Sequence, residues 1–539
     1  MSRLCLLPFL ALLSLTALRG AVAVTPVTAP HGMVVAAHPE VAEIGAEVLR
    51  RGGNAVDAAV SVSLALGVAE PFGSGLGGKL ALLYFDAATG RTYALDAMDE
   101  SGSRFAVGTG ERPAEGWASV CVPGLAAGLH EAHARWGRLP WVQTVAPAAE
   151  LARRGFEILP KTRQLYAEQG AKLRKPFARE AAAIYLPGGE LPEVGARQPN
   201  ADLARTLDLL AQHGRDGFYR GPVAEAIVRA AADAGGSFTA EDFAAYRPRF
   251  VEPIAVDVAG RTLVGLPPPA YGAALIFATL RALETSGPVA PLRTAANLDR
   301  FGRTYLGLLA RGRESFGDGP EARDRALELI RAAADSPAAG GAGGEASEGT
   351  THFVVVDRAG NIVCATQSLS LHFGAGVVAP GTGVVMNNTL SNFAYRAPAG
   401  ANAPGPRKRP TSTIAPLLVL EQGRPVLALG LPGSTRIPSG LLQVLADCLF
   451  FARPIGEAIG DTRVTWVGPA GERPPLLESE NTLPATVAEE LRRLGWSVDT
   501  QRAPGSGSHF GGVNAVTLNA DGSRTGYADP RRTNAAVGH

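Results

Sequence analysis

The sequence predicts a mixed α and β fold, and three patterns support that prediction. Residues Glu40–Arg51 repeat apolar side chains at helical spacing, and Asn54, just beyond a Gly-Gly stop, can cap a second helix. His352–Asp357 is instead a compact β-branched run, which is typical of a strand buried on both faces. With 539 residues, of which 46% are hydrophobic and 19% charged, the chain can bury one large core or two smaller ones.

The overall charge excludes some classes of partner. Lys and Arg number 51, Asp and Glu number 50, and the formal net charge is +1. Such a balance gives no bulk electrostatic reason to bind nucleic acid or an anionic membrane. Beyond the N-terminal segment no apolar run reaches about 18 residues, so we expect no stable membrane span.

The N-terminus has the pattern of an export signal. A short basic region, Met1–Arg3, precedes the apolar run Leu4–Leu18 and an A-x-A cleavage site at Ala21–Ala23. We expect residues 1–23 to direct the protein to the periplasm or the exterior and then to be removed; an uncleaved anchor is the alternative. Outside this segment an odd number of cysteines lie in apolar surroundings, which favours buried thiols over a disulfide framework: Cys121, Cys364 and Cys448.

Several familiar enzyme motifs fail on their context. Gly73–Gly78 has the spacing G-x-G-x-x-G, and Lys79 nearly completes a phosphate loop. A nucleotide loop follows a strand and opens a helix, however, whereas this segment follows a predicted helix and precedes the apolar strand Leu80–Phe85. The pair His130 and His133 misses the spacing of a zinc-binding helix by one residue. A G-x-S-x-G elbow does not occur, which argues against an α/β-hydrolase.

Thr350 stands where a predicted flexible linker meets a predicted buried strand. Residues 335–349 read DSPAAGGAGGEASEG, without a large apolar side chain, so we expect this segment to be mobile and exposed. If the chain is cut between Gly349 and Thr350, the new α-amine has an unperturbed pKa of roughly 7.7–8.0. That amine can serve as the base for the adjacent hydroxyl. The alternative is an ordinary linker followed by an ordinary core strand.

A returning strand is predicted to bring a second hydroxyl to Thr350. Asp357–Asn361 has turn chemistry, and Asn361–Ser370 has the pattern of a strand. A three-residue loop would place Ser368 opposite Thr350, whereas a one-residue bulge would turn Ser368 to the other face. With the first register, we expect Ser368 to orient the nucleophile.

The run TTHFVVVDRAGNIVCATQSLS, residues 350–370, resembles the start of the small subunit of the γ-glutamyltransferase family of self-cleaving N-terminal nucleophile hydrolases. Further similar stretches occur in the family's order, from about His38 to the C-terminus, including GGNAVDAAVSVSLALGVAEP, WGRLPW, PAAELARRGF and FYRGPVAEAI. The resemblance implies an α+β fold, a four-layer αββα sandwich. It also implies self-cleavage into a large subunit, residues 24–349, and a small subunit, residues 350–539.

The resemblance also assigns roles within the small subunit. Gly433 and Ser434 match a loop whose successive backbone N–H groups stabilise the tetrahedral intermediate, and Ser434 replaces a usual second glycine. Ser412 and Thr413 match hydroxyls that line the acyl pocket. The ending Ala528–Arg532 matches the family's closing motif, as a surface turn or in a closer role.

The ligands for an amino-acid head group depart from the family's pattern. Met98 aligns with an arginine that usually contacts the α-carboxylate, and methionine cannot make this contact. On the amine side, where Asn, Gln and an acidic residue are usual, the sequence has Ser370, Thr389 and Asn392. Catalysis can therefore be intact while the acyl specificity has changed.

Three functions remain open at this point. The first is a γ-glutamyltransferase or glutathione hydrolase, and the second is a related acylase resembling the glutaryl and cephalosporin acylases. The third is a secreted binding protein on an enzyme scaffold. The expected partners are a small-molecule or peptide amide and an amine or water acceptor. The resemblance implies no cofactor and no metal.

Overall fold

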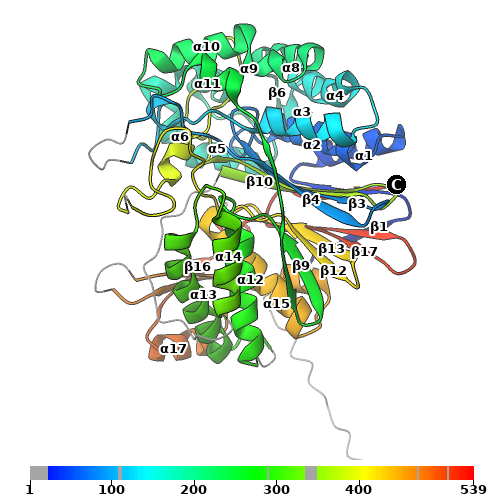
Figure 1. The fold of residues 1–539 in the computed structure, drawn as a ribbon, viewed down its shortest axis with the longest axis vertical. Coiled ribbons are helices and arrows are strands. Elements are labelled where there is room, and N and C mark those ends of the chain that lie inside the picture. Colours follow the sequence, from blue (N-terminus) through cyan, green and yellow to red (C-terminus); the bar gives the residue numbers. More distant parts are fainter. Residues whose placement is uncertain are drawn as a thin grey trace, which may run out of the picture.

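Two stacked sheets with helices on both outer faces make up the architecture (Figure 1). The computed structural model describes residues 22–106, 112–287, 291–333, 349–397, 399–469, 473–506 and 509–539. The four layers are those of the predicted αββα sandwich, and the fold prediction is confirmed. Residues 1–21 of the predicted signal and residues 335–348 of the predicted linker lie outside the described residues.

The first sheet combines strands from both sides of Thr350. Its seven strands, in spatial order, are β19 (Ala535–Gly538), β2 (Met33–Ala36), β10 (Gly349–Val356), β11 (Ile362–Ser370), β3 (Lys79–Asp86), β4 (Arg91–Ala97) and β7 (Arg249–Val251). β10 pairs antiparallel with β2, and β11 pairs antiparallel with β3. A cut before Thr350 would therefore leave both pieces hydrogen-bonded within one sheet.

The second sheet also draws its seven strands from distant parts of the chain. They are, in order, β1 (Pro26–Ala29), β18 (Arg524–Ala528), β17 (Asn514–Leu518), β13 (Arg424–Gly430), β12 (Leu417–Glu421), β9 (Arg261–Gly265) and β8 (Ile254–Val258). Smaller sheets comprise β14 (Val464–Val467), β15 (Leu476–Glu480) and β16 (Ser497–Arg502), and β5 (Phe156–Glu157) with β6 (Arg197–Gln198).

One helical layer covers the first sheet, at the top of Figure 1. It contains α1 (Pro39–Arg50), α2 (Ala55–Ala69), α3 (Leu125–Trp136), α4 (Trp141–Arg154), α5 (Pro160–Glu168), α6 (Gly170–Leu173), α7 (Arg179–Tyr185), α8 (Ala201–His213), α9 (Asp216–Tyr219), α10 (Gly221–Ala232) and α11 (Ala240–Ala245). The Asn54 side chain accepts from two backbone N–H groups at the start of α2, which confirms the predicted cap.

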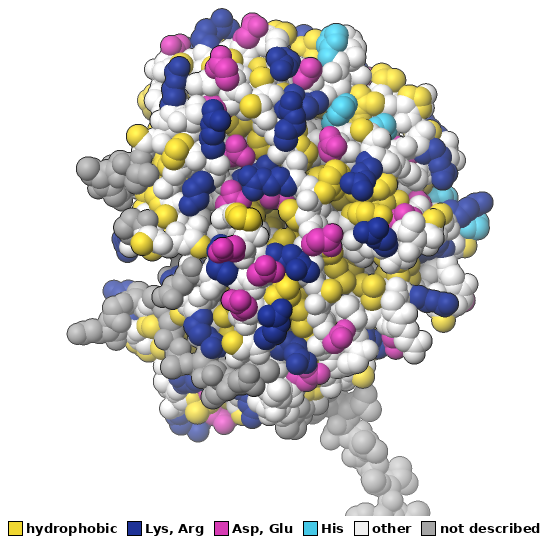
Figure 2. Space-filling view, viewed as in Figure 1, with side chains coloured by type: hydrophobic (Ala, Val, Ile, Leu, Met, Phe, Trp, Pro, Cys, Tyr) yellow, Lys and Arg dark blue, Asp and Glu magenta, His cyan; other side chains and the backbone are white. Residues whose placement is uncertain are grey.

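The other helical layer lies at the bottom of Figure 1, beyond the second sheet. It contains α12 (Gly272–Thr285), α13 (Ala295–Ser315), α14 (Ala322–Ala333), α15 (Ile437–Phe450), α16 (Ile455–Gly460) and α17 (Ala485–Arg493). None of the helices in the described part of the chain combines the length and hydropathy needed to cross a membrane. Figure 2 shows acidic and basic side chains interspersed over the face in view.

Strand β10 is buried on both faces, as its apolar run predicts. Phe353 and Val355 pack into the core under α1–α4, while Val354 and Val356 pack into the core between the sheets. This double burial fixes the register of the strand that begins beside Thr350.

The cysteines follow the prediction in two cases of three. Cys121 and Cys364 are buried free thiols, and burial raises the pKa of Cys364 to about 12. Cys448 is also free but only partly buried, because it lies near the end of α15. The prediction of a buried thiol is therefore wrong for Cys448, whereas the prediction of a free thiol is confirmed.

Candidate active site

Two hydroxyls meet where β10 begins. Thr350 pairs with Ser368 across β10 and β11, so the predicted register is confirmed. The Oγ atoms of these two residues are 3.0 Å apart, and Ser368 also donates to the carbonyl oxygen of Gly349 at 2.6 Å. Both hydroxyl-bearing residues are buried. Ser368 can thus orient the Thr350 hydroxyl and polarise the preceding carbonyl at the same time.

Gly349 is the last residue before Thr350, and it has no room for a side chain. The register shifts between Gly349 and Thr350, so that Gly349 pairs with Ser370. A Cβ atom on Gly349 would lie 2.0 Å from the carbonyl oxygen of Leu371. Any larger residue would displace the Gly349 carbonyl from Ser368. Gly349 itself belongs to β10, not to the predicted linker.

The glycine-rich segment Gly73–Gly78 packs against this hairpin. A Cβ atom on Gly73 would lie 3.4 Å from the Thr350 carbonyl oxygen, and one on Gly78 would lie 2.4 Å from that of Ser368. The Leu369 N–H donates to the Gly73 carbonyl at 3.2 Å. The glycines therefore permit close main-chain approach to the hairpin of β10 and β11.

Gly433 and Ser434 lie between β13 and α15, at the N-terminal end of that helix. Gly433 has φ of 149° and Ser434 has φ of 56°, in the left-handed region that favours glycine. Thr413 Oγ1 donates to the Ser434 carbonyl at 2.8 Å. This hydrogen bond helps to hold a serine in a backbone conformation where glycine would be less strained.

Charged side chains support this loop from behind. Glu478 accepts from Arg436 Nη2 and pairs with His509 Nε2, each at 3.1 Å. Burial raises the pKa of Glu478, but the bond with His509 and the charge of Arg436 outweigh burial and lower the pKa to about 2. The carboxylate thus ties the start of α15 to a neighbouring segment.

The closing motif, Ala528–Arg532, also supports the Gly433 loop. Asp529 is fully buried, accepts from Arg463 Nη2 at 3.0 Å, and accepts from the Val513 N–H at 3.2 Å. Arg463 donates to the Phe510 carbonyl at 3.2 Å. A Cβ atom on Gly511 would lie 1.8 Å from the Pro432 carbonyl oxygen, so this segment touches the Gly433 loop. The surface-turn interpretation of the motif is wrong.

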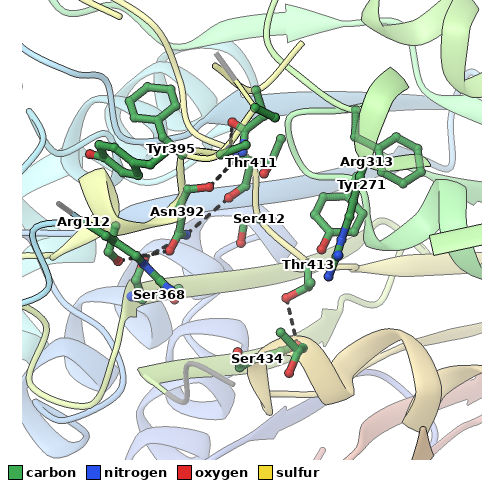
Figure 3. A pocket seen from close by; sticks show the side chains of 18 of the residues that line it. Arg112, Tyr271, Arg313, Ser368, Asn392, Tyr395, Thr411, Ser412, Thr413 and Ser434 are labelled. Carbon is green, nitrogen blue, oxygen red and sulfur yellow. Dashed lines mark hydrogen bonds between the residues drawn. The ribbon is translucent and has the colours of Figure 1, made fainter. Parts of the chain in front are cut away.

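A cavity of about 680 Å³ opens onto Thr350 (Figure 3). The described residues that line it are Arg112, Tyr271, Arg313, Phe316, Thr350, Ser368, Ser370, Ser391, Asn392, Phe393, Ala394, Tyr395, Arg396, Ala397, Asn402, Thr411, Ser412, Thr413, Ser434 and Thr435. They include three arginines but neither histidine nor a carboxylate. Residues on both sides of the predicted cut share the wall.

Most of the predicted acyl-pocket residues lie on this wall, but two do not. Ser370, Asn392, Ser412 and Thr413 line the cavity. Thr389 is fully buried behind Ser370, with their Oγ atoms 3.0 Å apart. Met98 is fully buried in the same hydrophobic core as Val354 and Val356. It does not line the cavity.

A buried ion pair behind the wall was missed by the sequence interpretation. Lys79 and Asp99 are both fully buried, and the Lys79 Nζ lies 3.4 Å from Asp99 Oδ2. Burial lowers the pKa of Lys79 and raises the pKa of Asp99 to about 6, while their mutual attraction opposes both shifts. One signal was available, because a lysine at the head of an apolar strand needs a buried partner.

His352 is near Thr350 in sequence but faces away from the cavity. It is fully buried, its Nδ1 lies 2.8 Å from Thr366 Oγ1, and burial lowers its pKa to about 3. It is therefore a neutral core residue. Across the described ranges, no group of three or more His, Cys, Asp or Glu residues could hold a metal ion.

The architecture matches a solved enzyme along nearly its whole length. The crystal structure of cephalosporin acylase from Bacillus halodurans superposes with a TM-score of 0.86 at 26% identity, over 96% of this chain and 97% of that one. The fold is that of an N-terminal nucleophile hydrolase, and the protein is an enzyme.

Its family follows from the sequence relatives. The model of the family Gamma-glutamyltranspeptidase matches residues 41–305 and 320–539. The glutathione hydrolase proenzyme of Bacillus subtilis (strain 168) is 31% identical over 554 residues, covering 94% of this chain and 91% of that protein. The acylase ACY 1 proenzyme of Pseudomonas sp. (strain V22) is 34% identical over 538 residues, covering 93% and 92%. The chain belongs to the gamma-glutamyltranspeptidase family.

Proposed function

We propose that this enzyme hydrolyses or transfers a γ-glutamyl-type acyl group through Thr350, after cleavage between Gly349 and Thr350. One observation carries the proposal. The Thr350 hydroxyl lies 3.0 Å from that of Ser368 at the cavity, and no described lining residue is histidine or a carboxylate. A hydroxyl needs a base to react at neutral pH, and the α-amine that cleavage would give to Thr350 can serve.

The geometry of the intact chain favours self-cleavage. The Thr350 Oγ attacks the carbonyl carbon of Gly349, which Ser368 polarises through its 2.6 Å hydrogen bond. The C–N bond breaks, the nitrogen takes a proton and becomes the α-amine, and an ester joins the two residues. Water then hydrolyses the ester and leaves a carboxylate on Gly349. Residues 24–349 and 350–539 stay together, because β2 pairs with β10 and β3 pairs with β11.

Turnover repeats this chemistry on an external amide. Thr350 attacks the substrate carbonyl, the backbone N–H groups of Gly433 and Ser434 stabilise the oxyanion, and the amine leaves. Water or an acceptor amine then takes the acyl group. The acyl chain is bound by side chains of the cavity wall: Ser370, Asn392, Ser412 and Thr413. Thr389 supports Ser370 from behind, and Met98, which lies in the core, has no direct contact with the acyl chain.

Two acyl donors fit this machinery. A γ-glutamyl donor is favoured by similarity to a glutathione hydrolase proenzyme. An acylase with another acyl group is favoured by Met98, which is fully buried, does not line the cavity, and cannot make the contact that the family's arginine makes to an α-carboxylate. The test is amine release from γ-glutamyl-p-nitroanilide and glutaryl-p-nitroanilide by the purified enzyme. Failure to release p-nitroaniline from either substrate would contradict the proposed reaction.

Cleavage is tested separately by the mass of the purified chains. We expect two fragments, the smaller beginning at Thr350, and a single uncut chain in Thr350→Ala. The matched variant Gly349→Ala should slow cleavage, because its Cβ atom has no space beside Leu371. Equal cleavage in all three proteins would overturn the assignment of this bond.

Export belongs to the same proposal. The basic and apolar N-terminal pattern and the A-x-A site support removal of residues 1–23. N-terminal sequencing of the large fragment from the exported fraction should begin at Val24. A large fragment that retains Met1 and stays with the membrane would indicate the uncleaved anchor.

A further inference from the structure

The buried lysine of the ion pair stands in line with the nucleophile. Thr350 pairs with Ser368, and Ser368 pairs with Lys79, so the three residues form one row across β10, β11 and β3. The Lys79 Nζ donates to Ser370 Oγ at 2.5 Å. Since Ser370 lines the cavity and Lys79 is fully buried, a single hydroxyl separates the ammonium from the cavity.

This arrangement uses up hydrogen-bond acceptors that a substrate ammonium would need. Ser370 Oγ accepts from Lys79 Nζ and from Asn392 Nδ2, the latter at 3.3 Å. Because a serine oxygen has two lone pairs, these two bonds leave Ser370 Oγ no acceptor site for a ligand. Its proton is directed to Thr389 Oγ1, 3.0 Å away, because the Thr389 proton is used by Asp99. Thr389 Oγ1 also accepts from Lys79, at 2.8 Å, and donates to Asp99 Oδ2 at 2.5 Å. The protein's own ammonium therefore occupies this polar cluster.

The charges on the cavity wall have the same sign as Lys79. The described lining residues include Arg112, Arg313 and Arg396 and contain no carboxylate. Arg112 and Arg313 stand on opposite sides of the cavity in Figure 3. Asp99 neutralises Lys79 from the buried side, behind Thr389. An acyl head group in this cavity thus meets positive charge from the wall and finds the acceptor sites of Ser370 already in use.

We propose that Lys79, acting through Ser370, selects acyl donors that carry a carboxylate but no neighbouring ammonium, that is, monoamides of dicarboxylic acids. The inference rests on the proposed function, since the acyl group must reach Thr350. Lys79 is a positioning residue, because Ser370 stands between it and the substrate. It occupies a lone pair of Ser370 Oγ, so that a substrate ammonium finds no acceptor there, whereas a carboxylate needs none and meets the arginines of the wall.

The experiment measures kcat/KM for three p-nitroanilides that differ by one charged group each: γ-glutamyl, glutaryl and the uncharged pentanoyl. We expect the wild-type enzyme to prefer glutaryl over both others. In Lys79→Met/Asp99→Asn the glutaryl preference over γ-glutamyl should fall at least about tenfold, the size of one charge-assisted hydrogen bond. The double variant removes both charges, so that no buried carboxylate is left unpaired.

Lys172→Met is the matched control. Lys172 is also buried, and its Nζ donates to the carbonyls of His372 and Gly374, but it does not line the cavity. Its loss should leave the ratio of the three substrates unchanged. Cleavage after Gly349 reports folding of each variant.

The outcomes separate this inference from the proposed function. Absence of cleavage and of turnover in the wild type would overturn the proposed function, whatever Lys79 does. Turnover that favours γ-glutamyl in the wild type, or an unchanged ratio in the active double variant, would overturn the role of Lys79 alone. A fall in glutaryl turnover matched by an equal fall for pentanoyl would also contradict it, since the uncharged acyl group should not respond to the charge.

Discussion

The two ends of the active-site cavity are built in different ways. The reaction end, around Thr350 and Ser368, consists of neutral hydroxyls and main-chain groups, and its central pair lies in one hairpin. Behind the head-group end lies a buried ion pair, whose Lys79 reaches Ser370 from 291 positions away in the chain. Local pairing can therefore preserve the reaction while distant charges alter the acyl group that is accepted.

The largest effect should come from a change of Thr350, the proposed nucleophile. Thr350→Ala removes the attacking oxygen, so we expect an uncut chain and a fall in turnover of at least about 10⁴-fold. Thr350→Ser keeps a hydroxyl and should retain measurable cleavage and turnover. Fragment masses and p-nitroaniline release provide the two measurements. Substantial turnover by Thr350→Ala would place the nucleophile elsewhere. The reaction end of the cavity could then no longer be assigned to Thr350 and Ser368.

Ser368→Ala tests whether the reaction end is separable from the head-group end. The variant loses the 3.0 Å contact with Thr350 and the 2.6 Å bond to the Gly349 carbonyl. We expect kcat to fall by about 10²–10³-fold, as for loss of one transition-state donor. The ratio of glutaryl to γ-glutamyl turnover should remain that of the wild type. A changed ratio would show that Ser368 also contacts the acyl head.

Glu478→Gln weakens the support of the proposed oxyanion loop, Gly433 and Ser434. Because the folded pKa of Glu478 is lowered from 4.5 to about 2, its contribution to stability is present above about pH 4.5 and is lost as the pH falls toward 2. The variant should lose up to about 3 kcal/mol of unfolding free energy at pH 7. At pH 2 it should differ little from the wild type.

Chemical denaturation at several pH values measures this difference. An equal loss of stability at pH 7 and pH 2 would mean that Glu478 contributes by packing and not by its charge. Arg436 and His509 are its partners, so the substrate ratio should again be unchanged.

The sequence predicted the reaction end better than the head-group end for a physical reason. The pairing of Thr350 with Ser368 depends on a short turn and on the alternation of neighbouring residues, both of which are local. The pairing of Ser368 with Lys79 joins segments that are far apart in the chain, and no local pattern encodes it. Lys79 was visible only as a misplaced phosphate-loop lysine at the head of an apolar strand.

Met98 also shows that a comparison of sequence positions misses contacts between neighbouring strands. Sequence comparison with the family indicated a missing cation at Met98, which directly follows β4. The structure has a cation on the neighbouring strand β3, at Lys79. A residue-by-residue comparison with the family finds that the arginine is missing at Met98. Only the order of the strands in the sheet shows that Lys79 lies on the neighbouring strand.

Thr413→Val should have the smallest effect and decides to which end Thr413 belongs. Thr413 lines the cavity, where the family resemblance assigns it to the acyl pocket, yet its Oγ1 donates to the Ser434 carbonyl at 2.8 Å. Loss of this neutral hydrogen bond, worth about 1 kcal/mol, should lower kcat roughly fivefold by loosening the strained Ser434. If Thr413 instead contacts the acyl chain, the variant should shift KM and the substrate ratio. Thr411→Val, on the same wall, is the control that separates loss of this bond from added apolar volume.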